Sequence, residues 1–512
     1  MADPEAASRL TRPGGIDTRR KPTPESPMVI KTQLDLLKYR RTKIVATLGP
    51  SCADEATIAQ LISAGVNVFR LNMSHGSQAG HRELYERVRA TAQRLALPVA
   101  IFADLCGPKI RTGLFKEKQI DLKTGDSVVV TTRDTTGSPG LIPSQYEALA
   151  DDVKPGNRIL LDDGKLEIEV ESIVGTEIQC RVVHGGVLKD KKGINLPGVS
   201  ISAPSLTDKD KADARFALAM GVDFLALSFV RRAADVTDLR RLIEQTDHPA
   251  GIIAKFEKPE ALENAAAIIG VSDAVMVARG DLGVELKPEQ VPIAQRKLID
   301  MARNLNRPVI VATQMLESMM ANTRPSRAEV SDISQAVIAG VDAVMLSGET
   351  ASGSFPVQTV QMMSRIIHQT EAYLFEENNF ADLERDLGRI EGPVPFGHAV
   401  AHATANLAKQ IDAKAILSLS NTGMSAVTIS SARPSAPLLA ISADPRTYHR
   451  LNLQWGTLPI LAEDAGHAHP NQLARRVAQQ SGIAAAGDYI VLVRGFHSNQ
   501  ALNTPSITLL MV

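Results

Sequence analysis

Short apolar runs recur through the middle of the chain, separated by segments in which apolar residues follow the spacing of helices. Eight of these runs are rich in β-branched residues and are predicted to be strands, beginning at Lys43, Val66, Pro98, Val222, Gly251, Asp273, Pro308 and Val341. Their apolar residues are continuous rather than alternating, which indicates strands buried on both faces in a parallel sheet covered by helices. Eight strand–helix units of this kind predict an α/β fold, a closed (β/α)₈ TIM barrel.

More than a hundred residues separate the third predicted strand from the fourth, which is too long for a single strand-to-helix connection. This stretch alternates apolar and polar positions between Gly and Asp turns, for example in "LKTGDSVVVTTRD", and is predicted to be an inserted small β-barrel domain. Because it follows a strand whose end lies at the barrel mouth, we expect it to act as a lid over that mouth.

Beyond the eighth strand, residues 357–374 are predicted to form a helix and residues 383–397 a connector. The remaining chain alternates helices with five apolar runs, which predicts a separate C-terminal α/β domain: "KAILSLS", "APLLAIS", "LPILA", "DYIVLVRG" and "SITLLMV". The predicted division is a catalytic barrel in two pieces (41–108 and 205–380), a lid (109–204) and a C-terminal α/β regulatory domain (381–512).

Residues 1–40 are rich in Pro, Arg and small side chains, and we expect a flexible tail. An organelle transit peptide is the alternative, because four arginines occur there. The acidic residues Asp3, Glu5 and Asp17 argue against it.

Composition narrows the classes of function. The chain has 512 residues and a formal net charge of −1, so no overall field attracts nucleic acid or a membrane, and we expect small-molecule partners. The three cysteines, Cys52, Cys106 and Cys180, have no CxxC spacing, which fits a reducing, cytoplasmic location better than a disulfide framework. No apolar run reaches the roughly 18 residues that cross a bilayer.

Polar side chains follow nearly every predicted barrel strand. In TIM barrels the carboxyl ends of the strands form one mouth, where the active site lies. We therefore expect these residues to share a site: Arg70, Asn72, Ser74, His75, Asp104, Ser228, Lys255, Glu257, Arg279, Asp281, Thr313, Gln314, Ser347 and Glu349.

Lys255 and Glu257 stand two apart in a strand, so their side chains leave by the same face. Together with Asp281, Glu257 would offer carboxylate oxygens to a hard cation, for which Mg²⁺ is the first choice. The alternative is that Lys255 and Glu257 form a structural ion pair.

Arg70, Arg111 and Lys192 add cations that the sequence does not match with nearby acids, which favours a phosphorylated, anionic substrate. The step from Gly280 to Asp281 predicts backbone N–H groups at a short helix start, a seat for a carboxylate. Metal and cations around a phosphoryl group are the requirement of phosphoryl transfer. The same residues would also suit a magnesium-dependent aldolase or lyase acting on an enolate, or a non-catalytic sensor.

Nine separated motifs, in order between about Thr42 and Pro356, resemble those of the pyruvate kinase family: "TLGPSC", "FRLNMSHG", "DLCGPKIRTG", "KKGINLPG", "LSFVR", "IIAKFEKPEALEN", "VMVARGDLGVE", "VATQMLESM" and "MLSGETASGSFP". The resemblance implies a glycolytic phosphotransferase that moves a phosphoryl group from phosphoenolpyruvate to ADP, giving pyruvate and ATP. It also implies a homotetramer.

By position, Lys255 resembles the family lysine that stabilises the moving phosphoryl group and the enolate, and Glu257 and Asp281 resemble its Mg²⁺ (or Mn²⁺) ligands. The resemblance implies phosphoenolpyruvate binding by Arg70, Ser228, Ala278, Arg279, Gly280, Asp281 and Thr313. It implies nucleotide binding by Asn72, His75, Arg111 and Lys192. Thr313 and Ser347 border the expected water path for protonation of the enolate.

Lys109 marks a departure within the family, because members that require potassium usually have Glu at this position. A tethered ammonium can replace the charge of a mobile cation, so we expect K⁺ not to be required. Asn72, Ser74 and Asp104, which match potassium ligands, remain as a vestigial K⁺ site.

The passage "SLSNTGMSA" resembles the family's phosphate-binding effector loop, with Thr422, Gly423 and Ser425 as the expected contacts. Met424 stands where basic residues often occur, so the resemblance implies a phosphorylated metabolite without identifying it. An ordinary capped turn is the alternative.

Overall fold

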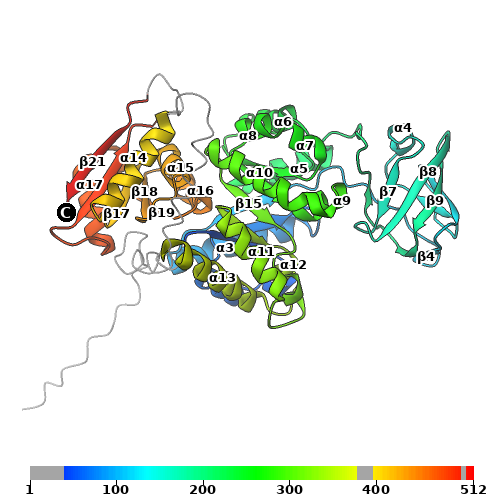
Figure 1. The fold of residues 1–512 in the computed structure, drawn as a ribbon, viewed down its shortest axis with the longest axis horizontal. Coiled ribbons are helices and arrows are strands. Elements are labelled where there is room, and N and C mark those ends of the chain that lie inside the picture. Colours follow the sequence, from blue (N-terminus) through cyan, green and yellow to red (C-terminus); the bar gives the residue numbers. More distant parts are fainter. Residues whose placement is uncertain (1–39, 377–395, 497–502) are drawn as a thin grey trace, which may run out of the picture.

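The computed structural model describes residues 40–376, 396–496 and 503–512. Residues 1–39 of the predicted tail and most of the connector predicted for 383–397 lie outside these ranges. Three bodies follow one another along the long axis, with the C-terminal domain at one end, the barrel in the centre and the lid at the other end (Figure 1).

The eight predicted barrel strands form a closed parallel barrel in the order β1-β16-β15-β14-β13-β12-β3-β2, which confirms the predicted fold. Their bounds are β1 Lys43–Thr47, β2 Val68–Asn72, β3 Ala100–Asp104, β12 Phe224–Leu227, β13 Gly251–Phe256, β14 Ala274–Ala278, β15 Val309–Ala312 and β16 Ala343–Leu346. Nearly every residue of these strands is buried, as continuous apolar runs require.

Helices cover the outside of the barrel: α2 Glu55–Ser63, α3 Gln78–Leu95, α5 Asp208–Met220, α6 Ala233–Glu244, α7 Pro259–Glu263, α8 Ala265–Val271, α9 Arg279–Glu285, α10 Val291–Asn304, α11 Arg327–Ile338, α12 Gly348–Ala351 and α13 Pro356–Glu376. Helix α5 starts with a capping box between Thr207 and Asp210. The second oxygen of Asp210 accepts a hydrogen bond from the N–H of Gly107 at 3.1 Å. This capping residue therefore also anchors the loop that follows β3 at the barrel mouth.

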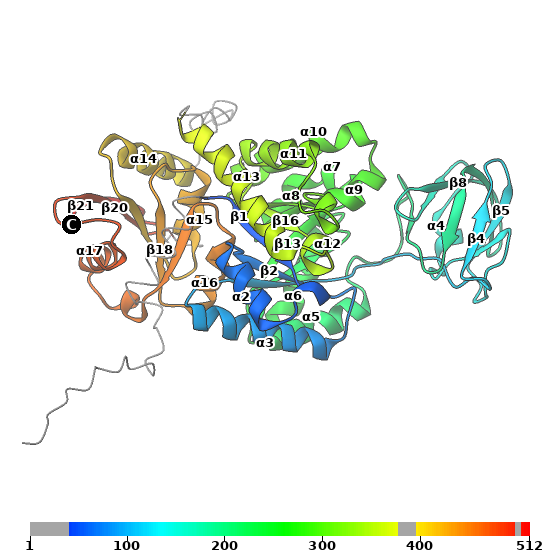
Figure 2. The same cartoon turned by 90° about the horizontal axis from the view of Figure 1, so that it is seen from below.

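The lid has its own hydrophobic cluster, which extends from Ile110 to Ile201. It consists of a two-stranded sheet, β10-β4, and a six-stranded sheet, β11-β7-β8-β9-β5-β6. The elements are β4 Gln119–Leu122, β5 Ser127–Thr131, β6 Leu141–Pro143, α4 Leu149–Asp152, β7 Arg158–Leu161, β8 Leu166–Val174, β9 Glu177–His184, β10 Gly186–Lys189 and β11 Ile194–Asn195. Extended segments join it to the barrel (Figure 2), and its residue limits stay a prediction.

The C-terminal domain is a five-stranded sheet in the order β19-β18-β17-β20-β21, in which only β21 is antiparallel to its neighbour. Its strands are β17 Ala415–Leu419, β18 Leu438–Ser442, β19 Thr457–Leu461, β20 Tyr489–Arg494 and β21 Ser506–Met511, and its helices are α14 Phe396–Gln410, α15 Met424–Ser431, α16 Pro445–Arg450 and α17 Pro470–Ser481. All five predicted strands are present.

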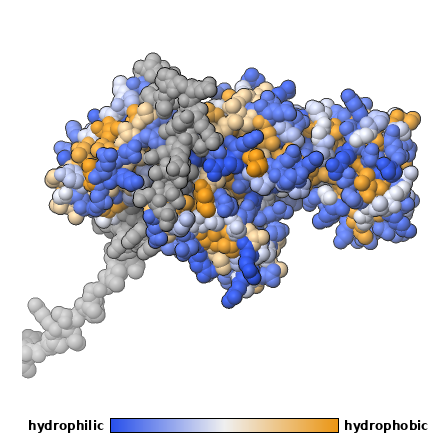
Figure 3. All heavy atoms as spheres, in the orientation of Figure 1, coloured by the Kyte–Doolittle hydropathy of each residue, from blue (hydrophilic) through white to orange (hydrophobic). Residues whose placement is uncertain are grey.

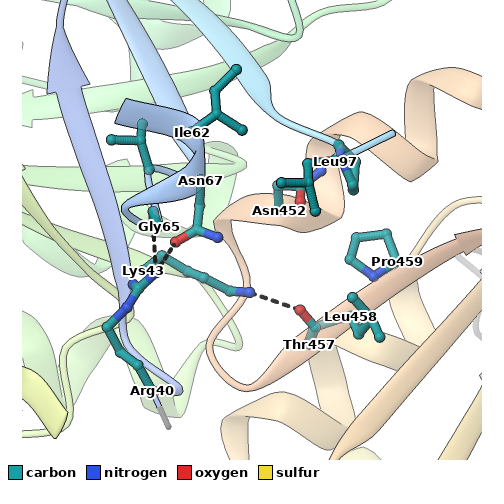
Figure 4. Close-up of a pocket in the computed structure, with 12 residues that line it drawn as sticks. Arg40, Lys43, Ile62, Gly65, Asn67, Leu97, Asn452, Thr457, Leu458 and Pro459 are labelled. Atoms are coloured by element: carbon teal, nitrogen blue, oxygen red, sulfur yellow. Dashed lines mark hydrogen bonds between the residues drawn. The ribbon is translucent and has the colours of Figure 1, made fainter. Parts of the chain in front are cut away.

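The C-terminal domain packs against the amino ends of the barrel strands, opposite the mouth. Arg433 donates to Asp342 at 2.8 Å, and both side chains are almost completely buried. Nearby, Nζ of Lys43 donates to the carbonyl of Thr457 at 2.7 Å beside a small cavity of about 40 Å³ (Figure 4). The barrel and the C-terminal domain are thus joined by buried polar contacts.

Lys43 makes this junction sensitive to pH. Burial, with the charges of Arg40 and Arg41, lowers the pKa of Lys43 to about 7. Between about pH 7 and the ordinary lysine pKa the unfolded chain binds the extra proton, so stability rises with pH across this window. We expect wild type to gain about 2 kcal/mol of unfolding free energy from pH 7 to 9 relative to Lys43→Met. Urea titrations of both proteins at both pH values measure this; parallel pH dependences would show that Lys43 keeps its ordinary pKa.

No helix within the described residues is long and apolar enough to cross a membrane. The face in Figure 3 is largely hydrophilic, with small hydrophobic areas dispersed over it.

Candidate active site

The carboxyl ends of β12 and β13 bring Lys255 into contact with three polar side chains. Its Nζ lies 2.6 Å from Oγ of Ser228, 2.9 Å from Oε1 of Glu257 and 3.1 Å from Oδ1 of Asp104. Burial alone would lower the pKa of Lys255, but the carboxylates of Asp104 and Glu257 raise it above the usual lysine value. Lys255 is therefore a fixed positive charge at the mouth.

Arg70 lies beside this cluster at the end of β2. Its Nε and Nη2 both lie 2.7 Å from Oδ2 of Asp104, and its Nη1 donates to Oγ1 of Thr47 at 3.2 Å. Burial opposes ionisation of Asp104, yet Lys255 and Arg70 hold its pKa below the usual range. The prediction of an unpaired Arg70 is wrong, because Asp104 is 34 residues away in sequence but adjacent in the barrel.

Glu257 and Asp281 provide carboxylate oxygens near Lys255. Oε2 of Glu257 accepts the N–H of Phe229 at 2.7 Å, and the side chain is buried. Burial and the charge of Asp281 raise the pKa of Glu257 above its usual value, although Lys255 opposes this. Asp281 is half-buried, lines the cleft below the lid, and has no ion-pair partner among the described residues. Two oxygen-donor side chains beside an open cleft fit a hard divalent cation.

No group of three or more His, Cys, Asp or Glu side chains in the described part of the chain is arranged to hold a metal.

The loop after β15 contacts the start of α9. Thr313 has a φ of 72° and Gln314 a φ of 54°, a left-handed conformation that is uncommon for a β-branched residue such as Thr. It places Oγ1 of Thr313 where it accepts the N–H of Gly280 at 2.7 Å. Ala278, which is buried, ends β14 directly before helix α9 begins.

Arg279 points away from the cluster. Its Nη1 lies 2.6 Å from Asp332, and its Nη2 donates to the carbonyl of Thr313 at 2.7 Å. Its guanidinium therefore braces the loop after β15.

A cleft of about 250 Å³ separates the mouth from the lid. Its lining includes three of the four predicted nucleotide residues, His75, Arg111 and Lys192, together with Lys109 and Asp281. Burial, followed by the charges of Lys109, Arg111 and Arg70, lowers the pKa of His75. The fourth residue, Asn72, is not part of this lining; its Oδ1 accepts the N–H of Ser74 at 3.2 Å.

The prediction that Lys192 is an unpaired cation is also wrong. Its Nζ lies 2.8 Å from Oδ1 of Asp162 within the lid, and the hydrogen bond from Lys192 lowers the pKa of Asp162. Arg111 instead donates to the carbonyl of Lys191 at 3.1 Å and has no ion-pair partner in the resolved ranges.

Ser347, at the end of β16, has a buried hydroxyl with no hydrogen-bond partner among the residues described. Its N–H donates to Glu349, whose other oxygen accepts the N–H of Leu316. An orphan hydroxyl of this kind is a suitable partner for a water molecule.

The sequence interpretation assigned no role to Lys258, Glu285 and Asn195. Nζ of Lys258 lies 2.6 Å from Oε1 of Glu285, and both side chains are almost fully buried. Asn195, in lid strand β11, lies close enough to Glu285 to lower its pKa slightly against the larger effect of burial, which raises it. The pair ties the chain after Glu257 to the helix that begins beside Asp281. No local sequence pattern marks this pair, because Lys258 and Glu285 lie 27 positions apart.

We expect Lys258→Met to lower the unfolding free energy by about 3 kcal/mol, because it leaves a buried carboxylate without its partner. Burial already raises the pKa of Glu285. Lys258→Met with Glu285→Leu should recover most of the loss, and denaturant titrations compare the variants. Equal stability of wild type and Lys258→Met would mean that the pair is solvated.

In the C-terminal domain, the predicted effector loop begins helix α15. Gly423 has a φ of 84° and precedes the helix, and Thr422 precedes it in the loop. The hydroxyls of Ser418 and Ser425 are buried and have no hydrogen-bond partner in the described part of the chain.

Comparison with known proteins places most of the chain in one family. Residues 39–360 match the family described as pyruvate kinase, barrel domain, and residues 398–508 match pyruvate kinase, alpha/beta domain. The chain is 44% identical over 461 residues to pyruvate kinase 2 of Synechocystis sp., covering 89% of this chain and 76% of that protein. It is 41% identical to the pyruvate kinase of Mycobacterium intracellulare, covering 89% and 95%. The crystal structure of a pyruvate kinase from Cryptosporidium parvum aligns with a TM-score of 0.85 at 35% identity, covering 93% and 97%.

Proposed function

The chain belongs to the pyruvate kinase family and is a phosphotransferase, and from this premise we propose that it transfers the phosphoryl group of phosphoenolpyruvate to ADP, with Mg²⁺, in glycolysis and without a need for potassium. The observation that carries the proposal is the contact of the Lys255 ammonium with Ser228, Asp104 and Glu257, beside the carboxylate of Asp281. One fixed cation and two acids that suit a metal would therefore act together on the phosphoryl group.

The acids suit the divalent ion. Glu257 and Asp281 would hold Mg²⁺ (or Mn²⁺) through oxygen, which leaves further positions to substrate oxygens and water. The bound ion would supply positive charge to the phosphoryl oxygens.

Side chains of this chain would do the rest. Lys255, held as a cation, stabilises charge on the transferring group and on the enolate left behind. Arg70, oriented by Asp104, binds the phosphoryl oxygens from the other side. The substrate carboxylate would lie at the start of α9, where Thr313 fixes the N–H of Gly280.

The proton for the enolate would arrive through water. The hydroxyls of Thr313 and Ser347 would orient such a water, and neither ionises readily near neutral pH. The Ser347 hydroxyl, which is buried and has no hydrogen-bond partner among the described residues, supports this role.

The nucleotide would occupy the cleft under the lid, near His75, Arg111 and Lys192. Lys192 would have to exchange Asp162 for a phosphate, which closure of the lid on ADP would permit. Asn72, which is not part of the cleft lining, would contact the nucleotide from the edge of the cleft.

A coupled assay of pyruvate formation tests the proposal. Purified protein should form pyruvate from phosphoenolpyruvate only when both ADP and Mg²⁺ are present. Pyruvate formation that does not depend on ADP would indicate a lyase or a phosphatase instead.

Lys109 is exposed at the cleft and lies close enough to His75 to influence its pKa. Its ammonium would supply the charge of a monovalent ion, so we expect kcat to stay within about twofold when tetramethylammonium replaces potassium. Initial rates in the two salts at equal ionic strength measure this. Loss of activity without potassium would assign a real K⁺ site to Asn72, Ser74 and Asp104, and Lys109→Glu should create such a requirement.

The C-terminal domain would bind a phosphorylated effector. The unpartnered hydroxyls of Ser418 and Ser425, beside the backbone turn at Thr422 and Gly423, support a phosphate at the start of α15. Titrating the initial rate with sugar phosphates and nucleotides would identify the ligand. We also propose that the chain assembles as a homotetramer and that it acts in the cytoplasm. Light scattering of the purified protein would test the assembly.

A further inference from the structure

A larger cavity of about 630 Å³ lies at the junction of the barrel and the C-terminal domain, away from the mouth. One wall is the C-terminal part of α3 and the turn after it, between Arg89 and Val99. The other wall is α16 and Leu461. The volume falls in the range of sites for small organic ligands. The cavity shares no lining residue with the cleft under the lid.

The walls are apolar and include aromatic rings. Ala92, Leu97, Val99 and Leu461 contribute apolar surface. On α16 the rings of Tyr448 and His449 lie 5.4 Å apart at 46°. Such a surface favours a flat aromatic body, which can pack on rings and methyl groups together.

The charged side chains of the lining are two arginines, Arg89 and Arg94, and no Asp or Glu lines the cavity. Burial lowers the pKa of His449, which therefore lines the cavity as a neutral imidazole. Arg89 is neutralised by Asp223 at 2.7 Å, whereas Arg94 pairs with Glu55 on the surface, where both side chains are more than half exposed. A surface pair of this kind is weak and readily exchanged.

His449 offers a second polar contact. Its Nδ1 lies 3.7 Å from Asp223, and its Nε2 has no hydrogen-bond partner in the ranges that the structure describes. Arg94 and His449 therefore place donors around an apolar chamber, and the one nearby acid, Asp223, is neutralised by Arg89 and is not part of the lining.

We propose that this cavity binds a small aromatic carboxylate, with its ring between α3 and α16 and its carboxylate on Arg94 and His449. The ligand touches both domains. Val99 precedes β3, which ends at Asp104, and Thr447 on α16 donates to the carbonyl of Asn421 in the loop before α15. Occupation of the cavity thus stabilises the junction between the two domains.

The test uses 2-naphthoate as the probe and its neutral amide, 2-naphthamide, as the matched compound, with the full-length protein in isothermal titration calorimetry. We expect saturable binding of one 2-naphthoate per chain, and affinity about tenfold weaker for the amide and for Arg94→Gln, because each removes a charge-assisted hydrogen bond. Ala90→Trp, at an exposed lining position, should abolish binding by filling the opening. Gln93→Trp, at another exposed lining position, replaces Ala90→Trp in the test if Ala90→Trp folds poorly.

Arg82→Gln is the matched control, since Arg82 lies on the same helix over Phe216 and outside the cavity. Arg82→Gln should bind 2-naphthoate with the affinity of wild type. That affinity should be the same with and without phosphoenolpyruvate and Mg²⁺. The proposal is overturned if 2-naphthoate does not bind below about 1 mM, if the amide binds equally well, or if both tryptophan variants retain full affinity.

Discussion

Lys255→Met should lower kcat about a thousandfold while changing the KM for phosphoenolpyruvate little. The ammonium is held by Ser228, Asp104 and Glu257. In the proposed reaction, negative charge develops beside it on the phosphoryl group and the enolate. Removing one preorganised cation or donor from such a site typically costs this much in kcat. Methionine keeps the length of the side chain and removes the charge. Steady-state kinetics with a coupled pyruvate assay measure both constants.

Two controls make the result specific. Lys211→Met removes an exposed lysine that pairs with Asp208 on α5 and should leave both constants unchanged. Circular dichroism of Lys255→Met should match wild type, because the loss is one of charge and not of fold. A rise in KM with kcat unchanged would mean that Lys255 only binds substrate.

Asp281→Asn should raise the Mg²⁺ concentration needed for half-maximal activity about a hundredfold or more. The carboxylate of Asp281 has no ion-pair partner among the described residues and lines the cleft, so a metal is the partner that fits it. Loss even of a residue that merely orients a metal ligand costs about 10- to 100-fold in affinity, and loss of a ligand should cost at least as much.

Binding of Mn²⁺, followed by electron paramagnetic resonance, separates this role from an effect on catalysis. Asp281→Asn should leave most Mn²⁺ free at concentrations that saturate wild type. Asp208→Asn, the same change at an exposed position, is the control and should bind as wild type does. Unchanged Mn²⁺ affinity in Asp281→Asn would remove Asp281 from the metal site.

The barrel could be predicted because its strands are buried on both faces, which leaves an unbroken apolar run at each of them. The polar residues at the ends of these runs, such as Arg70, Lys255 and Thr313, mark the mouth, because the apolar pattern breaks where each buried strand ends. Strand order follows from chain order in a barrel of this type, so the sequence also indicated that Lys255 and Asp281 approach each other.

The pairing of charges could not be read from the sequence. Arg70 with Asp104 and Lys192 with Asp162 lie 34 and 30 positions apart, and only the folded arrangement decides which acid meets which base. Lys258 and Glu285 could not be predicted as a pair, because a single Lys or Glu at the end of a helix has the same sequence pattern whether it is buried or solvated. The junction at Lys43 depends on where the C-terminal domain packs, which no local pattern specifies.

A crystal structure with Mn²⁺ and phosphoenolpyruvate would decide whether Lys255, Glu257 and Asp281 act on one phosphoryl group. We expect one anomalous peak for Mn²⁺ coordinated by both carboxylates and by the substrate, with Nζ of Lys255 about 3 Å from a phosphoryl oxygen. Manganese bound away from either carboxylate, or a phosphoryl group out of reach of Lys255, would contradict the account.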